Sequence, residues 1–152
     1  MAEDFSKAVN DFALKVDQEN EQIIKGTVIS LYGDIIKASP VDTGRFRANW
    51  FLDGMTPSVK VTTSTDKGGE ATTQKMQTGV LNATDFSVFT LTNNLPYSEA
   101  IEFGRYPSPS ETGDKTANGF SKQAPAGVVR INTVRFETLL NNEAKKENYG
   151  GI

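Results

Sequence analysis

The 152-residue chain contains no cysteine and no histidine. Without cysteine there is no disulfide framework, no thiolate ligand for a metal ion and no thiol nucleophile. Without histidine the commonest general base and the commonest ligand of transition metals are missing as well. The sequence therefore disfavours catalysis, and we expect no catalytic residues, no metal and no cofactor.

Clusters of basic residues and long apolar runs are also missing. The chain has 16 Lys and Arg against 19 Asp and Glu, a net charge of −3. Binding to nucleic acid through charge depends on clustered cations that displace counterions, so a DNA-binding module is a weak alternative. A surface that faces DNA without gripping it is compatible with this balance. No apolar run approaches the roughly 18 residues of a membrane span, and the acidic start does not resemble a signal peptide, so we expect a protein made in a cytoplasm that does not enter membranes.

The pattern of residues 5–38 predicts one long helix with two apolar faces. At about 1.5 Å per residue it extends roughly 50 Å, more than the width of a compact domain of this size. We therefore predict that one half packs on the chain's own core and that the second apolar set contacts a neighbouring subunit. A bend or break near Gly26 is the alternative. The first apolar set is Phe5, Val9, Phe12, Val16 and Ile23, and the second is Ile24, Val28, Leu31 and Ile35.

After this helix, alternating apolar and polar residues predict a small antiparallel sheet. We expect a hairpin over 46–63, with Val59 and Val61 inward, and a central strand over 85–94, which carries apolar residues on both faces. Residues 71–81 are weakly helical, and a short helix over 97–103 ends at Gly104 in the usual C′ position.

The last third of the chain begins with a long polar segment. Residues 105–123 contain several Pro and Gly and predict a long loop, which is uncommon in compact domains and usually functional. A C-terminal helix is expected over 125–142 and a flexible tail over 143–152. The whole chain thus predicts a single α+β domain, 1–152, with a long N-terminal helix, a small antiparallel sheet and a C-terminal helix packed on the sheet.

The junction between the long helix and the sheet is the most informative segment. Pro40 ends the helix because it lacks an N–H and biases the residue before it away from helical angles. Asp42 and Thr43 can fold their side-chain oxygens onto nearby backbone N–H groups, and Gly44 permits a positive φ. Two arginines on alternate positions follow, and Trp50 closes the segment.

Glu102 is the carboxylate that we single out. It lies between apolar residues just before Gly104, so we expect it to be partly buried, and a partly buried carboxylate requires a charged partner. We predict an ion pair with Arg45 or Arg47 of the junction. A solvated Glu at a helix end is the alternative.

Scattered carboxylates leave an enzyme as an alternative from another class. A small metal-dependent nuclease would hold Mg²⁺ through such groups, but their spacing matches no known signature. The carboxylates in question are Asp42, Asp53, Asp85, Glu99 and Glu102.

Three motifs together resemble the tail-completion, or neck, proteins of tailed bacteriophages, also called the minor tail protein Z-like group. The first is Ser39-Pro40-Val41-Asp42-Thr43-Gly44-Arg45-Phe46-Arg47 with Trp50. The second is Asn93-Asn94-Leu95-Pro96-Tyr97 with Ile101-Glu102-Phe103-Gly104. The third is Ala124-Pro125-Ala126-Gly127-Val128-Val129-Arg130. They occur in the order that the family has and span about residues 39–130.

The resemblance implies a structural virion protein and not an enzyme. Such a protein would form a ring, most simply a hexamer, at the head–tail junction or tail end of the virion, after assembly in the host cytoplasm. Its partners would be other copies of itself, the head-completion, tail-terminator and tail-tube proteins, and DNA that passes through the lumen without sequence-specific binding. A tail-terminator ring that caps the tail tube is the alternative within this class. The site residues that we predict, for the structural junction and the suspected ion pair, are Asp42, Thr43, Gly44, Arg45, Trp50, Tyr97, Glu102 and Gly104.

Overall fold

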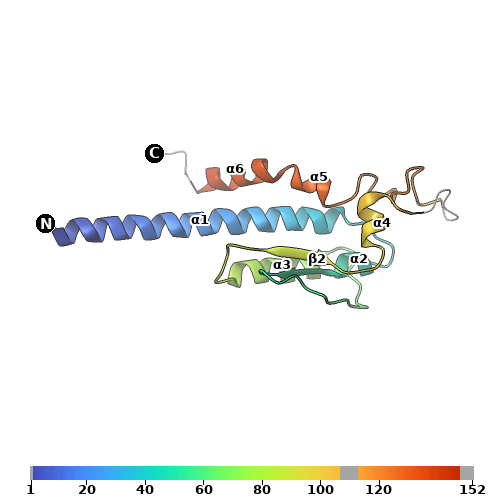
Figure 1. The fold of residues 1–152 in the computed structure, drawn as a ribbon, viewed down its shortest axis with the longest axis horizontal. Coiled ribbons are helices and arrows are strands. Elements are labelled where there is room, and N and C mark those ends of the chain that lie inside the picture. The colour runs from blue at the N-terminus through green and yellow to red at the C-terminus, as the bar shows by residue number, and fades with distance from the viewer. Residues whose placement is uncertain (1, 107–112, 148–152) are drawn as a thin grey trace.

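The computed structural model describes residues 2–106 and 113–147, and these form a mixed fold of helices with a small sheet (Figure 1). The α+β class predicted from the sequence is confirmed. The elements are α1 (Ala2–Ala38), α2 (Arg45–Ala48), β1 (Trp50–Asp53), α3 (Glu70–Asn82), β2 (Thr90–Asn93), α4 (Ser98–Phe103), α5 (Arg130–Thr133) and α6 (Phe136–Lys146).

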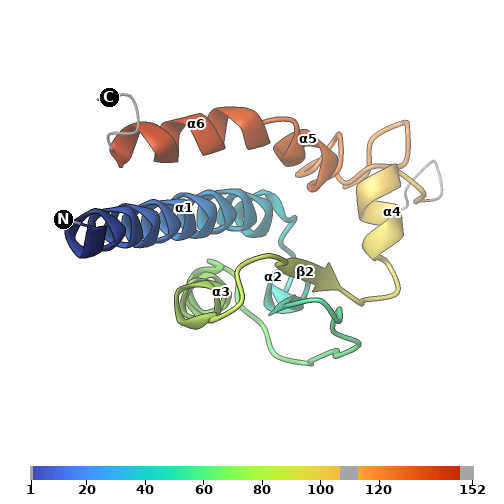
Figure 2. The ribbon, with the colours of Figure 1, turned by 60° about the vertical axis from the view of Figure 1, so that its left-hand side comes forward.

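The long helix α1 lies between two layers. On one side are α5 and α6, and on the other are α2, α3 and the two strands, while α4 and the segments beside it cover the C-terminal end of α1 (Figures 1 and 2). The N-terminal half of α1 extends beyond both layers. The core is therefore concentrated around the C-terminal half of α1, where Leu31, Ile35 and Ile36 meet residues of α2, α3 and α4.

Helix α1 is continuous through Gly26, so the alternative of a break there is wrong. Its first turn carries Glu3 and Asp4 and its last turn Lys37, which both suit the helix dipole. The helix ends before Pro40, as the proline predicts.

The environments of the two apolar sets of α1 are the reverse of those predicted. Leu31 and Ile35 are only 8% and 3% exposed and belong to the chain's own core, so their prediction as inter-subunit contacts is wrong. Val28 is partly buried against the same core, and Ile24 is half-buried. Most of the first set lies instead on the protruding half, where Phe5 is 72% and Phe12 66% exposed. The assignment failed because both sets have helical spacing, and spacing alone does not say which one the rest of the chain covers.

Lys25 links α1 to the C-terminal end of α3 through hydrogen bonds. Its ammonium donates hydrogen bonds to the carbonyl oxygens of Leu81 and Ala83, at 3.1 and 2.8 Å, and lies 2.6 Å from the carboxylate of Glu21. The last carbonyls of a helix have no partner within it, so this buried lysine satisfies free acceptors at the C-terminus of α3.

Gly33 offers a test of the helix assignment. It lies inside α1, and a Cβ added there would meet no other atom of the described chain within 4 Å. Gly33→Ala should raise the free energy of unfolding by about 0.5–1 kcal/mol, because Gly loses more backbone entropy in a helix than Ala does. Chemical denaturation would measure it. Gly26→Ala is the matched comparison and should gain less, since its Cβ would lie 2.5 Å from Oε2 of Glu143; a loss of stability in Gly33→Ala would contradict the packing described.

The two strands pair with each other and not within the expected hairpin. Strand β1 runs antiparallel to β2, with Trp50 opposite Asn93 and Asp53 opposite Thr90. The first residues of the predicted 46–63 hairpin are instead helix α2, and β2 covers only the end of the predicted 85–94 strand. Strand β2 has β1 as its one neighbour in the described sheet, so it is not central.

The segment expected to complete the hairpin, residues 58–63, forms no strand and no backbone ladder. Side-chain amides hold it instead: Asn49 bonds both backbone groups of Thr62, and Asn94 donates to the carbonyls of Ser58 and Lys60. Val59 and Val61 are exposed, so their inward orientation is also wrong. A period-two pattern predicts extended backbone, but it does not identify the partner strand.

The C-terminal helix is divided and begins later than predicted. Residues 125–129 form turns, and α5 and α6 follow. Helix α6 packs on α1, on the side away from the sheet, so its predicted packing on the sheet is wrong (Figures 1 and 2). The helix starts late because the N–H groups of Val128, Val129 and Arg130 bind the carboxylate of Glu102. Of the tail predicted over 143–152, the first residues belong to α6, and residues 148–152 lie outside the described residues.

The remaining short elements agree with the sequence. Helix α3 covers the weakly helical 71–81, and α4 covers most of 97–103 and ends at Gly104, with φ of 68°. The described parts of the predicted loop 105–123 form turns and a single bridge between Lys115 and Ser121, while 107–112 lie outside the described residues.

Candidate functional site

Arg47 holds the end of α1 in place. Its Nε donates to the carbonyl of Ser39 at 3.1 Å, and its two terminal nitrogens donate to the carbonyls of Lys37 and Lys67, both at 2.6 Å. These carbonyls lie at the end of a helix and in a loop, where the backbone supplies no partner. Arg47 therefore binds backbone oxygens and not the carboxylate of Glu102, so that prediction is wrong for Arg47.

Asn49 is a second polar side chain that joins distant segments, and it is fully buried. Its amide nitrogen donates to the carbonyls of Arg45 and Thr62, at 2.8 and 3.0 Å, and its amide oxygen accepts the N–H of Thr62 at 2.8 Å. All three of these hydrogen bonds are made with backbone groups. We did not single out Asn49 from the sequence, although a lone amide between Ala48 and Trp50 in an apolar segment is a signal.

Three aromatic rings connect the junction with α4. The rings of Phe46 and Trp50 meet edge to face with centroids 5.7 Å apart, and those of Phe46 and Tyr97 are 6.0 Å apart. The indole N–H of Trp50 donates to Oγ of Ser39 at 2.8 Å. Trp50 and Tyr97 were both predicted for this site, and the structure brings them together around Phe46.

The turn before α2 has the predicted geometry at two of its three residues. The Thr43 hydroxyl oxygen accepts the N–H of Arg45 at 3.3 Å, and Gly44 has φ of 89°. The Gly44 carbonyl also accepts the N–H of Asp66 at 3.0 Å, so this turn and the loop before α3 are in direct contact. Asp42, by contrast, makes no hydrogen bond or ion pair with the residues that the structure describes.

Glu102 is bound by the third sequence motif and not by the first. Its carboxylate accepts the N–H groups of Val128, Val129 and Arg130 at 2.8–3.0 Å, and Nε of Arg130 lies 3.0 Å from Oε1. The Arg130 guanidinium also donates to the Glu102 carbonyl at 2.5 Å. The predicted pair with Arg45 is wrong, because the Nε of Arg45 donates to the carbonyl of Thr62. The expectation of partial burial is confirmed, with the Glu102 side chain 12% exposed.

Gly127 allows this arrangement. Its φ is 84°, and a Cβ added there would lie 2.6 Å from the carbonyl oxygen of Glu102 and 2.9 Å from Oε2. Three successive backbone N–H groups thus form a concave anion-binding turn that is filled by the chain's own carboxylate.

The pKa of Glu102 reflects two opposed effects. Burial raises the pKa of the carboxyl, but the hydrogen bonds from Val129, Arg130 and Val128 and from the Arg130 side chain lower it further than burial raises it. The result is a pKa below the usual value. Asp66 shows the same balance, because hydrogen bonds from Thr72 and Gly69 and the charge of Arg47 outweigh its burial and lower its pKa.

These lowered pKa values predict that the free energy of unfolding falls at acidic pH. In the unfolded chain, Glu102 binds a proton at about pH 4.3, whereas in the folded chain it does so only at a lower pH. The stabilisation from Glu102 is therefore complete above the unfolded-state pKa and is lost as the pH falls through the folded-state pKa. Urea titrations between pH 7 and 3 should show a falling free energy of unfolding. Glu102→Gln should be less stable at neutral pH and show a shallower fall. An equal fall in both proteins would contradict the assignment.

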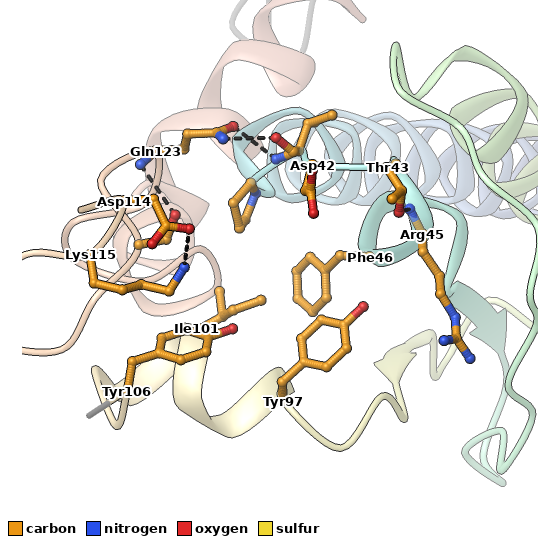
Figure 3. Close-up of a pocket in the computed structure, with 14 residues that line it drawn as sticks. Asp42, Thr43, Arg45, Phe46, Tyr97, Ile101, Tyr106, Asp114, Lys115 and Gln123 are labelled. Carbon is orange, nitrogen blue, oxygen red and sulfur yellow. Dashed lines mark hydrogen bonds and ion pairs between the residues drawn. The ribbon is translucent and has the colours of Figure 1, made fainter. Parts of the chain in front are cut away.

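A cavity of about 380 Å³ lies between the junction turn, α4 and the segment after residue 113 (Figure 3). Phe46 and Ile101 line its apolar part, and the Tyr97 hydroxyl points toward the turn while the Tyr106 hydroxyl points toward Ile101. Burial raises the pKa of Tyr97; the nearby Arg45 lowers it and Asp42 raises it. Burial also raises the pKa of Tyr106, so both tyrosines are neutral at physiological pH.

At the rim of the cavity, hydrogen bonds join two segments that lie far apart in the sequence. The backbone of Val41 and the side-chain amide of Gln123 exchange two hydrogen bonds of 2.8 Å. The ammonium of Lys115 lies 4.5 Å from the ring centroid of Tyr106 and 2.7 Å from a carboxylate oxygen of Asp114. The junction, α4 and the segment 113–123 therefore form one connected unit that contains all eight of the predicted site residues.

The polar side chains of this unit hold segments of the chain itself in position. Arg45, Arg47 and Glu102 bind backbone groups, and Glu102 also pairs with Arg130. Among residues 2–106 and 113–147, no group of three His, Cys, Asp or Glu side chains is placed to hold a metal ion. In the same ranges, no helix is long and apolar enough to cross a membrane.

No protein-family model matches the chain, and neither a curated protein nor a solved structure matches it. The likeness to neck proteins therefore depends on the three motifs. The structure places all three in contact: the first and second meet at Phe46 and Tyr97, and the second and third meet at Glu102 and Arg130.

Proposed function

We propose that this chain is a structural protein of a tailed bacteriophage virion, a tail-completion or neck protein that works by assembly. It would form a ring, most simply of six copies, at the head–tail junction, through which DNA passes without sequence-specific binding. Its other partners would be the adjoining head-completion, tail-terminator and tail-tube proteins.

The observation that carries this proposal is the protruding half of α1. Phe5, Val9 and Phe12 share one face of a helix that extends beyond the rest of the molecule, and all three are exposed (Figure 1). Leaving several large apolar side chains in water is costly, at about 25 cal/mol per Å² of apolar surface, and contiguous apolar faces mark interaction sites. A helix held rigidly at one end by the junction and apolar at the other is suited to join copies at a fixed angle.

The connected motifs support the same proposal. Arg47, Asn49 and Glu102 use their polar groups to fix backbone segments of the chain itself. Such a unit sets the angle between α1 and the sheet, and in a closed assembly that angle would determine how many copies complete the ring.

The test is made on virions from the genome that encodes the chain. Mass spectrometry of purified particles should find the protein in a fixed number of copies per particle, and loss of the gene should leave filled heads and tails that do not join. Phe12→Ser should reproduce that defect, whereas Leu14→Ser, at an exposed position on the opposite face of α1, should not. Particles that are complete without the protein would contradict the proposal.

A further inference from the structure

We propose that, before any ring forms, two copies of this chain pair through the protruding halves of α1 as an antiparallel helix dimer. The inference goes beyond the proposed function, since it concerns the protein in solution. We define the arm as residues 3–19 of α1 and the arm stripe as Phe5, Val9, Phe12 and Val16.

The spacing of the arm stripe is that of a helix pair. Its residues follow one another at intervals of four, three and four, which is the 3.5-residue repeat of two helices that pack side by side. Phe5 and Phe12 occupy one of the two repeat positions, and Val9 and Val16 occupy the other. Phe5, Val9 and Phe12 are exposed and Val16 is half-buried.

Three of the four residues that flank the stripe are small. Ala8 and Lys15 lie on one side and Ser6 and Ala13 lie on the other, and all four are exposed. Small flanking side chains let two helix backbones approach closely, and they add no charge to the apolar seam. A globular partner would gain less from this feature than a second helix.

An antiparallel pairing matches the stripe to itself. With Val9 level with Phe12 of the second copy, Phe5 is level with Val16, so every layer contains one Phe and one Val and the layers have equal volume. A parallel pairing places Phe against Phe and Val against Val, which gives layers of unequal size. Close packing favours the first arrangement.

Charge favours the same direction. Glu19 continues the repeat after Val16, so a parallel pair would place two Glu19 side chains against each other in the seam. In the antiparallel pair, Glu19 lies level with the first turn of the second arm. Lys15, which pairs with Glu19 at 3.8 Å in its own helix, then lies on the same side as Asp4 of the second copy and about 3 Å from it along the axis. One cation would thus face acids of both chains.

The available area predicts a weak dimer. A Phe side chain buries roughly 150–250 Å², so two partly exposed Phe and two Val offer about 400 Å² per arm and about 800 Å² per pair. Stable interfaces bury about 1,200 Å² or more. We therefore expect a dissociation constant on the order of 10–100 μM, which allows the arms to separate when other contacts become available.

Sedimentation velocity of the full chain over a concentration series tests the pairing. The expected result is a monomer–dimer equilibrium that Phe12→Ser weakens at least about tenfold and that Leu14→Ser leaves unchanged, since Leu14 is 60% exposed on the opposite face. Both variants should keep the helical circular dichroism and melting temperature of the parent, because these residues lie outside the core. A monomer at every concentration, or a dimer insensitive to Phe12→Ser, would overturn the proposal, as would a monomer that instead binds a different protein.

Disulfide trapping tests the direction, and the absence of cysteine from the chain makes it direct. Phe5→Cys and Val16→Cys proteins, mixed and mildly oxidised, should form mainly the mixed 5–16 dimer. In the antiparallel pair two copies of residue 5 are about 16 Å apart along the axis, too far for a disulfide. Lys7→Cys mixed with Leu14→Cys is the matched control, level in the pair but on the outer faces, and should not cross-link. Predominant 5–5 and 16–16 dimers would overturn the antiparallel arrangement, whatever the fate of the virion experiment.

Discussion

Replacing Glu102 with Ala should lower the free energy of unfolding by about 2–4 kcal/mol. The substitution removes one acceptor that binds the N–H groups of Val128, Val129 and Arg130, and it leaves the Arg130 guanidinium without its charged partner. Unpaired buried donors lose the full cost of their desolvation, and charged ones lose more than neutral ones. Urea denaturation at pH 7 measures the effect.

Glu99 supplies the matched control on the same helix. It also pairs with an arginine, Arg105 at 3.0 Å, but its side chain is exposed. Exposed ion pairs are worth little, so Glu99→Ala should change the free energy of unfolding by no more than about 0.5 kcal/mol. Equal effects at Glu99 and Glu102 would show that the backbone contacts of Glu102 carry no stability.

Replacing Gly44 with Ala should destabilise the chain by about 2–4 kcal/mol. The residue has φ of 89°, which costs an L-residue about 1–2 kcal/mol. A Cβ there would also lie 2.6 Å from the backbone nitrogen of Lys67 and 2.9 Å from that of Asp66. The second effect adds to the first, because a backbone cannot move aside as the end of a side chain can. Thermal and urea denaturation would measure the loss.

Gly113 separates the two causes. It has nearly the same conformation, with φ of 67°, but a Cβ added there meets no atom of the residues that the structure describes within 4 Å. Gly113→Ala should therefore lose only the conformational part, about 1 kcal/mol. If Gly44→Ala were no more damaging than Gly113→Ala, the contact between the junction turn and the loop before α3 would not be as described.

Local rules predicted the elements whose signals are local. The length of α1 and its end before Pro40, the turn at Thr43 and Gly44, and the end of α4 at Gly104 all follow from spacing, a missing N–H or a permitted positive φ. These features need no knowledge of the rest of the fold.

Contacts between distant segments were harder to predict. The partner of β1 is β2 and not the nearer 58–63, because two asparagine amides occupy the backbone groups of that nearer segment. The partners of Glu102 and Arg47 are largely backbone N–H and C=O groups, which every residue has and which leave no mark in the sequence. The two apolar faces of α1 were assigned wrongly for a similar reason. Periodicity shows that a helix face is apolar, but it does not show what covers that face.

The three sequence motifs nevertheless lie together in one part of the molecule. The predicted site residues meet in one unit around Phe46, Tyr97 and Glu102, although the ion pair inside it is different from the one expected. This unit fixes the direction of α1, and in the proposed assembly that direction would set the angle between neighbouring copies.

The most direct test of the proposed assembly is an image reconstruction of the virion, from the genome that encodes the chain, combined with the copy number of the protein. We expect a closed ring between head and tail, most simply of six copies, with the N-terminal half of α1 at the contacts between protomers. A protein that is monomeric at all concentrations and absent from purified particles would contradict the account.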